Sequence, residues 1–160
     1  MDRKPWLIRV EMKEYRDDGI INAPLSSVWT LINSHLDDAA IHAIHPECLE
    51  QTTESRGSPD SVVNRVIDVR GRPMKSRWKL TLRPPNFYRW EIVGGEGPWQ
   101  TGTYVESTFS EAPGGTRIVT NGSLYISVLP FFLPQGVMIR RILAQIEAQD
   151  EARLATIAPR

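Results

Sequence analysis

The stretch MKSRWKLTLR, residues 74–83, decides the fold class of this chain. Its side chains alternate with a period of two, which is the spacing of a β-strand with one buried face and one solvated face. The apolar face carries Met74, Trp78, Leu80 and Leu82, and the opposite face carries Lys75, Arg77, Lys79 and Arg83. The segment therefore predicts a strand in an antiparallel sheet, because such sheets commonly cover a core with one face only.

The same alternation continues on both sides of this segment, from Cys48 to Ser127. Turn signals such as Gly71-Arg72-Pro73 and Pro113-Gly114-Gly115 separate the alternating runs. The runs predict six strands, near residues 49–55, 62–69, 74–82, 88–93, 101–109 and 117–126. Short connections between successive strands indicate an antiparallel meander.

The segment before the meander predicts one more strand and two short helices. Residues 6–15 alternate like a strand, and Asp17-Asp18-Gly19 then predicts a turn. Pro24 suits the first position of a helix with an apolar face over residues 25–32. A second short helix is predicted over residues 37–44, and Pro46 ends it.

The segment after the meander predicts a long amphipathic helix over residues 134–157. Its apolar side chains recur at the i, i+3, i+4 spacing of one helix face. They are Ile139, Ile142, Leu143, Ile146, Leu154 and Ile157. We therefore expect an α+β protein in which a curved sheet of seven antiparallel strands surrounds this helix, as a single domain over residues 1–160.

Composition excludes several classes of function. The chain has 160 residues, and its 19 basic residues balance its 19 acidic ones, so no overall field favours nucleic acid. Its lone cysteine, Cys48, excludes an intramolecular disulfide. The longest apolar stretch, residues 126–143, is interrupted by two prolines, a glycine and an arginine pair, so we expect no transmembrane helix. The start of the chain lacks the apolar run of a signal peptide, which predicts a cytoplasmic protein.

Two short motifs resemble a known superfamily. Ile21-Asn22-Ala23-Pro24 with Val28-Trp29 resembles its entry to the first helix, and Gly114-Gly115-Thr116-Arg117-Ile118 resembles the turn that opens its last strand. The chain is thus similar to the SRPBCC (START-like, helix-grip) superfamily, of the polyketide cyclase/dehydrase and lipid-transport type. The resemblance implies a cavity between the sheet and the last helix, and it implies no single chemistry.

Aromatic residues on the predicted strands are candidates for the wall of that cavity. Tyrosine and tryptophan combine a large apolar area with one polar group, which suits a pocket for a mostly apolar ligand. The alternative is ordinary core packing. The direction of Tyr104 stays open, because Val105, Ser107 and Phe109 compete for the inner face of the same strand. The predicted lining residues are Trp78, Leu80, Tyr88, Trp90, Tyr104, Ile142 and Ile146.

His42, His45 and Cys48 form a sequence pattern that could bind zinc. Pro46 interrupts the helix that would align them, and no fourth ligand is marked, so we predict no metal site. The alternative is a polar corner in which Cys48 is buried as a small apolar residue. The resemblance implies that His42 and His45 lie at the cavity mouth.

The segment 129–134 is strongly apolar for a loop. We predict that it folds back over the cavity, with Phe131 and Phe132 at the mouth, or packs against the first helices, because large exposed apolar patches are rare on monomers. The alternative is a transient contact with a membrane or a partner protein.

These features predict binding or transport of a hydrophobic small molecule such as a lipid, an isoprenoid or a polyketide, with no cofactor. No serine lies in a nucleophile-elbow context, and the glycine-rich segment 94–97 precedes a strand rather than a helix. Two rival hypotheses stay open: a cyclase/dehydratase enzyme that moves a proton on such a ligand, and a regulatory domain that binds a partner protein. The sequence leaves ligand identity and oligomeric state open.

Overall fold

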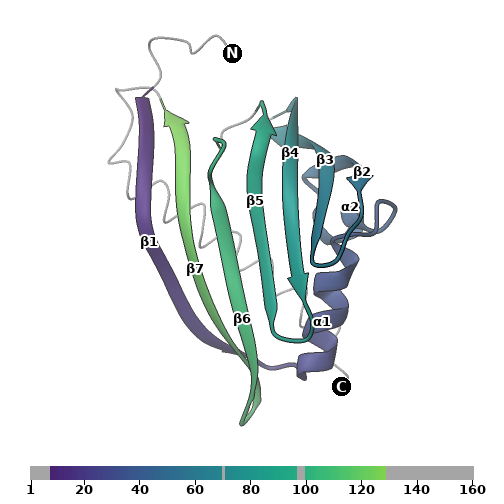
Figure 1. Cartoon of the computed structure of the whole chain (residues 1–160), viewed down its shortest axis with the longest axis vertical. Helices are drawn as coiled ribbons and strands as arrows, with labels where there is room; N and C mark the ends of the chain where they lie inside the picture. The colour runs from purple at the N-terminus through teal and green to yellow at the C-terminus, as the bar shows by residue number, and fades with distance from the viewer. Residues whose placement is uncertain (1–7, 70, 97–99, 129–160) are drawn as a thin grey trace.

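The computed structural model describes residues 8–69, 71–96 and 100–128, and within them one antiparallel sheet of seven strands with two short helices. The strand order is β1-β7-β6-β5-β4-β3-β2, so every neighbour in the sheet is also a neighbour in sequence except β1 and β7 (Figure 1). The elements are β1 (Ile8–Ile21), α1 (Leu25–Ser34), α2 (Ile41–Ile44), β2 (Cys48–Ser55), β3 (Asp60–Val69), β4 (Arg72–Arg83), β5 (Phe87–Gly95), β6 (Tyr104–Ala112) and β7 (Gly115–Val128).

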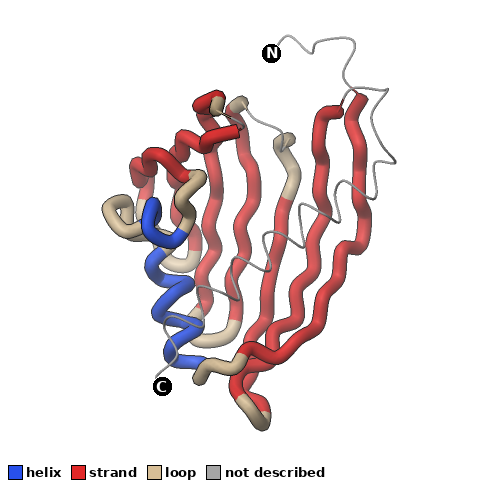
Figure 2. The backbone as a smooth tube through the Cα atoms, turned by 180° about the vertical axis from the view of Figure 1, so that it is seen from behind, coloured by secondary structure: helices blue, strands red, loops and turns tan. Residues whose placement is uncertain are grey.

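The predicted curved sheet and the two short helices are confirmed, although α2 begins at Ile41, four residues later than predicted. Helices α1 and α2 lie beside the β2–β4 end of the sheet, and the strands bend along their length (Figures 1 and 2). Pro24 takes the N-cap position of α1, one position before the first helical residue that was predicted for it. Its carbonyl accepts hydrogen bonds from the amides of Ser27 and Val28. The predicted helix 134–157, with Ile142 and Ile146, and the segment 129–134 lie outside the described residues.

The predicted turn at residues 17–19 is wrong, because β1 continues through it to Ile21. Asp17, Asp18 and Gly19 pair in register with Thr120, Val119 and Ile118 of β7. The Arg117 guanidinium also donates from Nε and Nη2 to the Asp18 carboxylate, at 3.0 and 2.6 Å. Pairing along a long neighbouring strand therefore overrides the local turn preference of this tripeptide.

Strand β6 begins at Tyr104, three residues later than predicted. A tight turn occupies the preceding residues, in which the Thr103 amide donates to the Gln100 carbonyl and the Gly102 amide to the Ile92 carbonyl. Gly102 has a φ of 93°, a left-handed conformation that other residues rarely adopt.

Strand register divides the side chains of the sheet between two faces. We call the face against which α1 packs the inner face. The apolar face of α1, Val28, Leu31 and Ile32, joins one core with apolar residues of β3, β4 and β6. The buried members of that core are Ala23, Val28, Leu31, Ile32, Val63, Leu80, Leu82 and Phe109. The inner face is therefore the predicted apolar face of the 74–83 strand.

Candidate functional site

Four of the predicted lining residues lie together on the inner face. The rings of Trp78 and Trp90 are 5.1 Å apart at an interplanar angle of 47°. Leu80 is fully buried opposite Trp90, and Tyr88 lies opposite Leu82 in the β4–β5 register. Trp78, Tyr88 and Trp90 keep partial exposure, although they pack against the buried core. We call Trp78, Leu80, Tyr88 and Trp90 the aromatic wall.

Tyr104 does not belong to this group. It pairs with Glu91 across β5 and β6, whereas Trp90 pairs with Val105, and paired residues of antiparallel strands project to the same face. The Arg89 guanidinium lies over the Tyr104 ring at 4.0 Å and also contacts Glu91 and Glu106. Tyr104 therefore lies on the outer face of the sheet. Val105, which competed with it for the inner face on sequence alone, lies on the inner face.

A buried arginine lies beside the aromatic wall. The Arg65 guanidinium is 4.8 Å from the centre of the Trp78 ring. Its Nε donates to Gln51 Oε1 at 2.8 Å, and Gln51 Nε2 donates to the His35 carbonyl and to Asp38 Oδ1. Arg65 is only 5% exposed, and its Nη2 has no hydrogen-bond partner. Burial lowers the pKa of Arg65, because a cation is destabilised away from water.

Two histidines and a glutamate form a hydrogen-bonded chain at the same end of the inner face. His35 Nδ1 lies 3.1 Å from the Leu31 carbonyl, and since a carbonyl only accepts, this nitrogen donates. His35 Nε2 lies 3.0 Å from His45 Nε2, and His45 Nδ1 lies 3.0 Å from Glu47 Oε1. In the neutral form of His35, Nε2 therefore has no proton, and this nitrogen faces His45.

His35 is held neutral by its surroundings. Burial, the neighbouring His45 and the Arg65 charge, in that order, lower the pKa of His35 to about 3. Its ring also packs against Tyr88, with centroids 5.4 Å apart. The side chain thus links α1 to the aromatic wall as a fixed hydrogen-bonding group.

The three residues of the suspected zinc pattern do not turn toward a common point. His42 Nδ1 donates to the Cys48 carbonyl at 2.9 Å, whereas His45 turns toward His35 and Glu47. Cys48 is buried, and burial raises the pKa of its thiol. Within residues 8–69, 71–96 and 100–128, no three histidine, cysteine or acidic side chains are arranged to hold a metal ion.

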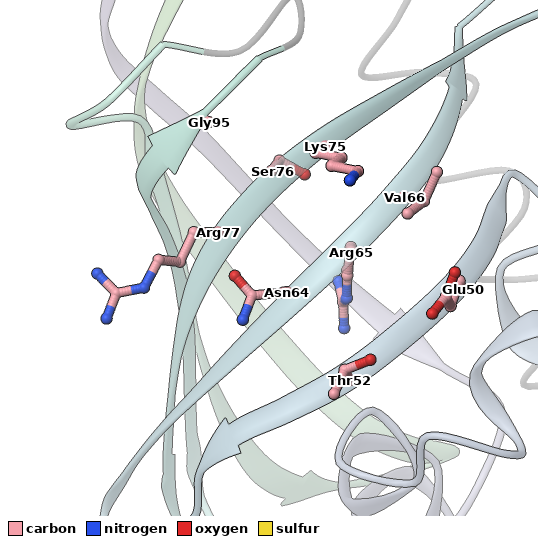
Figure 3. A pocket seen from close by; sticks show the side chains of 9 residues that line it. All are labelled: Glu50, Thr52, Asn64, Arg65, Val66, Lys75, Ser76, Arg77 and Gly95. Carbon is pink, nitrogen blue, oxygen red and sulfur yellow. The ribbon is translucent and has the colours of Figure 1, made fainter.

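A hollow of about 440 Å³ lies on the outer side of β2, β3 and β4 (Figure 3). Its border carries charged groups such as Glu50, Lys75 and Arg77, and Arg77 is paired with Glu54 at 2.6 Å. The residues that line it are Glu50, Thr52, Asn64, Arg65, Val66, Lys75, Ser76, Arg77 and Gly95. Its charged rim is a poor match for an apolar molecule, so the inner face is the better candidate site.

Sequence reasoning missed His35, Gln51 and Arg65. For Arg65 a signal was present, because alternation in the predicted strand 62–69 places it on the same face as Val63 and Ile67. A basic residue in an otherwise apolar row marks a buried charge. His35 follows the predicted helix, and nothing in its local sequence indicates its contact with His45.

Solved structures similar to this one share its fold at low sequence identity. The structure of Ara h 8.0201 has a TM-score of 0.69 at 14% identity and covers 92% of this chain and 99% of its own. The Zhui aromatase/cyclase from Streptomyces sp. R1128 has a TM-score of 0.61 at 14% identity, covering 94% and 92%. A START superfamily protein from Mycobacterium smegmatis has a TM-score of 0.67 at 12% identity, covering 92% and 100%.

No curated protein sequence matches the chain. In the part of the chain that the structure describes, no helix is long and apolar enough to cross a membrane. The family model described as polyketide cyclase / dehydrase and lipid transport matches residues 12–157, which is nearly the whole chain. The chain therefore belongs to the polyketide cyclase / dehydrase and lipid transport family.

Proposed function

We propose that this protein binds a hydrophobic small molecule against the inner face of its sheet and carries it without chemical change. The observation that supports the proposal is the aromatic wall, in which Trp78, Tyr88 and Trp90 keep partial exposure on the face that holds the core. Lipids, isoprenoids and polyketides are the candidate ligands. We further propose that the whole chain acts as one domain without a cofactor, and that Ile142 and Ile146 add to the lining.

Apolar burial supplies the affinity in this proposal. Removing apolar surface from water contributes about 25 cal/mol per Å², and association and ordering offset part of that gain. A medium-sized ligand that covers both tryptophan rings should therefore bind with a dissociation constant on the order of micromolar.

The test is tryptophan fluorescence during titration with fatty acids, isoprenoid quinones and aromatic polyketides. A ligand that enters beside Trp78 and Trp90 should change the emission in a saturable way. Trp90→Ala removes one side of the wall, so it should weaken binding at least tenfold. The matched control is Tyr104→Ala, which removes an aromatic side chain from the outer face of the next strand and should leave the affinity within twofold.

Two outcomes would count against the proposal. Equal weakening by Trp90→Ala and Tyr104→Ala would mean that the inner face is not the binding surface. The absence of saturable binding by any compound would leave the partner-protein hypothesis as the better one.

A second candidate is a cyclase/dehydratase that acts on such a ligand. Arg65 favours it, because a buried charge next to an aromatic wall can stabilise charge that develops on a bound molecule. One similar structure is named an aromatase/cyclase, and another, the di-domain ARO/CYC BexL, is spanned by this chain over 50% of its length at 13% identity and a TM-score of 0.72. His35 is a poor general base, because both of its ring nitrogens are already engaged.

Mass spectrometry separates this candidate from the carrier. Incubation with a linear poly-β-ketone thioester should return the compound unchanged if the protein only carries it. A product lighter by one water, formed by the wild type and not by Arg65→Met, would identify the enzyme instead.

A further inference from the structure

Arg65 is a buried cation without an anion in contact. It is 5% exposed, and none of the carboxylates in the described part of the chain forms an ion pair with it. Its Nη2 atom is buried and unpartnered. Burial of an unpaired charge is strongly unfavourable, so a folded protein that retains one commonly uses it.

The nearest carboxylates are already occupied. Asp38 accepts hydrogen bonds at Oδ1 from the side chains of Gln51 and Thr53, and at Oδ2 from the Thr53 amide. Glu47 accepts from His45 Nδ1. Both carboxylates act on Arg65 only at longer range. In this arrangement neither carboxylate forms an ion pair with Arg65.

The position of Arg65 relates this charge to the aromatic wall. Its Nε donates to Gln51, and its Cζ lies 4.8 Å from the centre of the Trp78 ring, which in turn packs against Trp90. The remaining donors of a guanidinium match the two oxygens of a carboxylate. An apolar molecule with a terminal acid group could pack its body against the aromatic wall and pair its carboxylate with the Arg65 charge.

We propose that Arg65 binds the carboxylate of an apolar acid whose body lies against Trp78 and Trp90. This inference rests on the proposed function and restricts it to acidic ligands. A charge-assisted hydrogen bond in a buried site should favour the acid over its uncharged ester at least about tenfold.

The experiment compares dodecanoate with methyl dodecanoate, and 2-naphthoate with methyl 2-naphthoate, at pH 7.5 by tryptophan fluorescence. The wild type should bind each acid at least tenfold more tightly than its ester. Arg65→Met replaces the cation with an apolar side chain of similar length, so the acid and the ester should then bind about equally. The control Arg77→Met removes an arginine of β4 that pairs with Glu54 on the outer face, and it should preserve the preference.

The wild-type comparison needs no variant, so it decides the matter even if Arg65→Met does not fold. Equal binding of acid and ester by the wild type would overturn the role of Arg65 while leaving the proposed function in place. A preference that persists in Arg65→Met would do the same. Failure of all four compounds to bind would overturn both proposals.

Discussion

At the scale of single residues, His35 is a group whose charge depends on the fold. It lies at the C-terminal end of α1, and its Nδ1 donates to carbonyls of the same helix, those of Leu31 and Ile32. Protonation of Nε2 would place a positive charge on a buried ring next to His45 and Arg65, and each of these surroundings lowers the pKa of His35. The folded state therefore opposes protonation of His35.

This opposition predicts a pH dependence of stability. In the unfolded chain the pKa of His35 is near 6.5. In the folded chain its pKa is lowered to about 3. Below pH 6.5 the unfolded state binds more protons, so stability is full above that value and falls as the pH approaches 3. The slope from this group is about 1.4 kcal/mol per pH unit.

Urea unfolding of the wild type and of His35→Asn between pH 7 and 5 measures this slope, in a range where most carboxylates stay ionised. The asparagine amide can donate to the same helix carbonyls but does not titrate. Its curve should be flatter by about one kcal/mol per pH unit. Parallel curves for the two proteins would show that His35 does not contribute.

Residue-level reading of the sequence was reliable where alternation was unbroken. It placed Trp78, Leu80 and Trp90 on one face correctly, because each lies in a run with a clear period of two. The direction of Tyr104 stayed open because its strand has large side chains at consecutive positions, and only pairing with Glu91 determines it. The role of Arg65 could not be predicted from periodicity alone. Alternation places its side chain on the inner face but does not indicate that a charged group is kept there.

At the scale of elements, the end of β5 contains two adjacent glycines with different roles. Gly95 has a φ of 104°, and a Cβ there would lie 2.5 Å from the Lys75 carbonyl oxygen of β4. A Cβ at Gly94 would meet no other atom within 4 Å, and Gly94 has no positive φ. Of the two glycines, only Gly95 is therefore needed for the close approach of β4 and β5 beside the outer hollow.

Gly95→Ala should lower the free energy of unfolding by more than about 2 kcal/mol, through backbone strain together with the steric clash. Gly94→Ala is the matched control and should stay within about 0.5 kcal/mol of the wild type. Chemical denaturation followed by circular dichroism gives both values. Similar losses in the two variants would mean that β5 does not approach β4 in this way.

Element boundaries were less predictable than element types. The second half of β1 contains Asp17-Asp18-Gly19, whose composition favours a turn, and only the pairing with β7 makes it a strand. The start of β6 was misplaced because the turn at Gly102 is held by carbonyls of distant residues, such as Ile92. Long-range partners decided both cases, and a local pattern contains no information about them.

At the scale of the whole molecule, the sheet is a meander joined to a first strand from the other end of the sequence. The β2 to β7 pairs are all formed between consecutive strands, whereas β1 pairs with β7. The buried Thr116 side chain strengthens this junction by donating to the Ala23 carbonyl at 2.8 Å. The net charge of zero provides no overall field that would favour a polyelectrolyte.

The pairing of β1 with β7 has a consequence for the order of folding. Adjacent hairpins close short loops, but joining Ile21 to Thr116 closes a loop that contains the rest of the sheet, and the entropy lost on closure rises with loop length. Contacts of this kind slow folding. We expect β1 to join a preformed meander in the last kinetic step, so pulsed hydrogen exchange during refolding should protect the amides of β6 before those of β1. Simultaneous protection of the two strands would instead indicate a single concerted step.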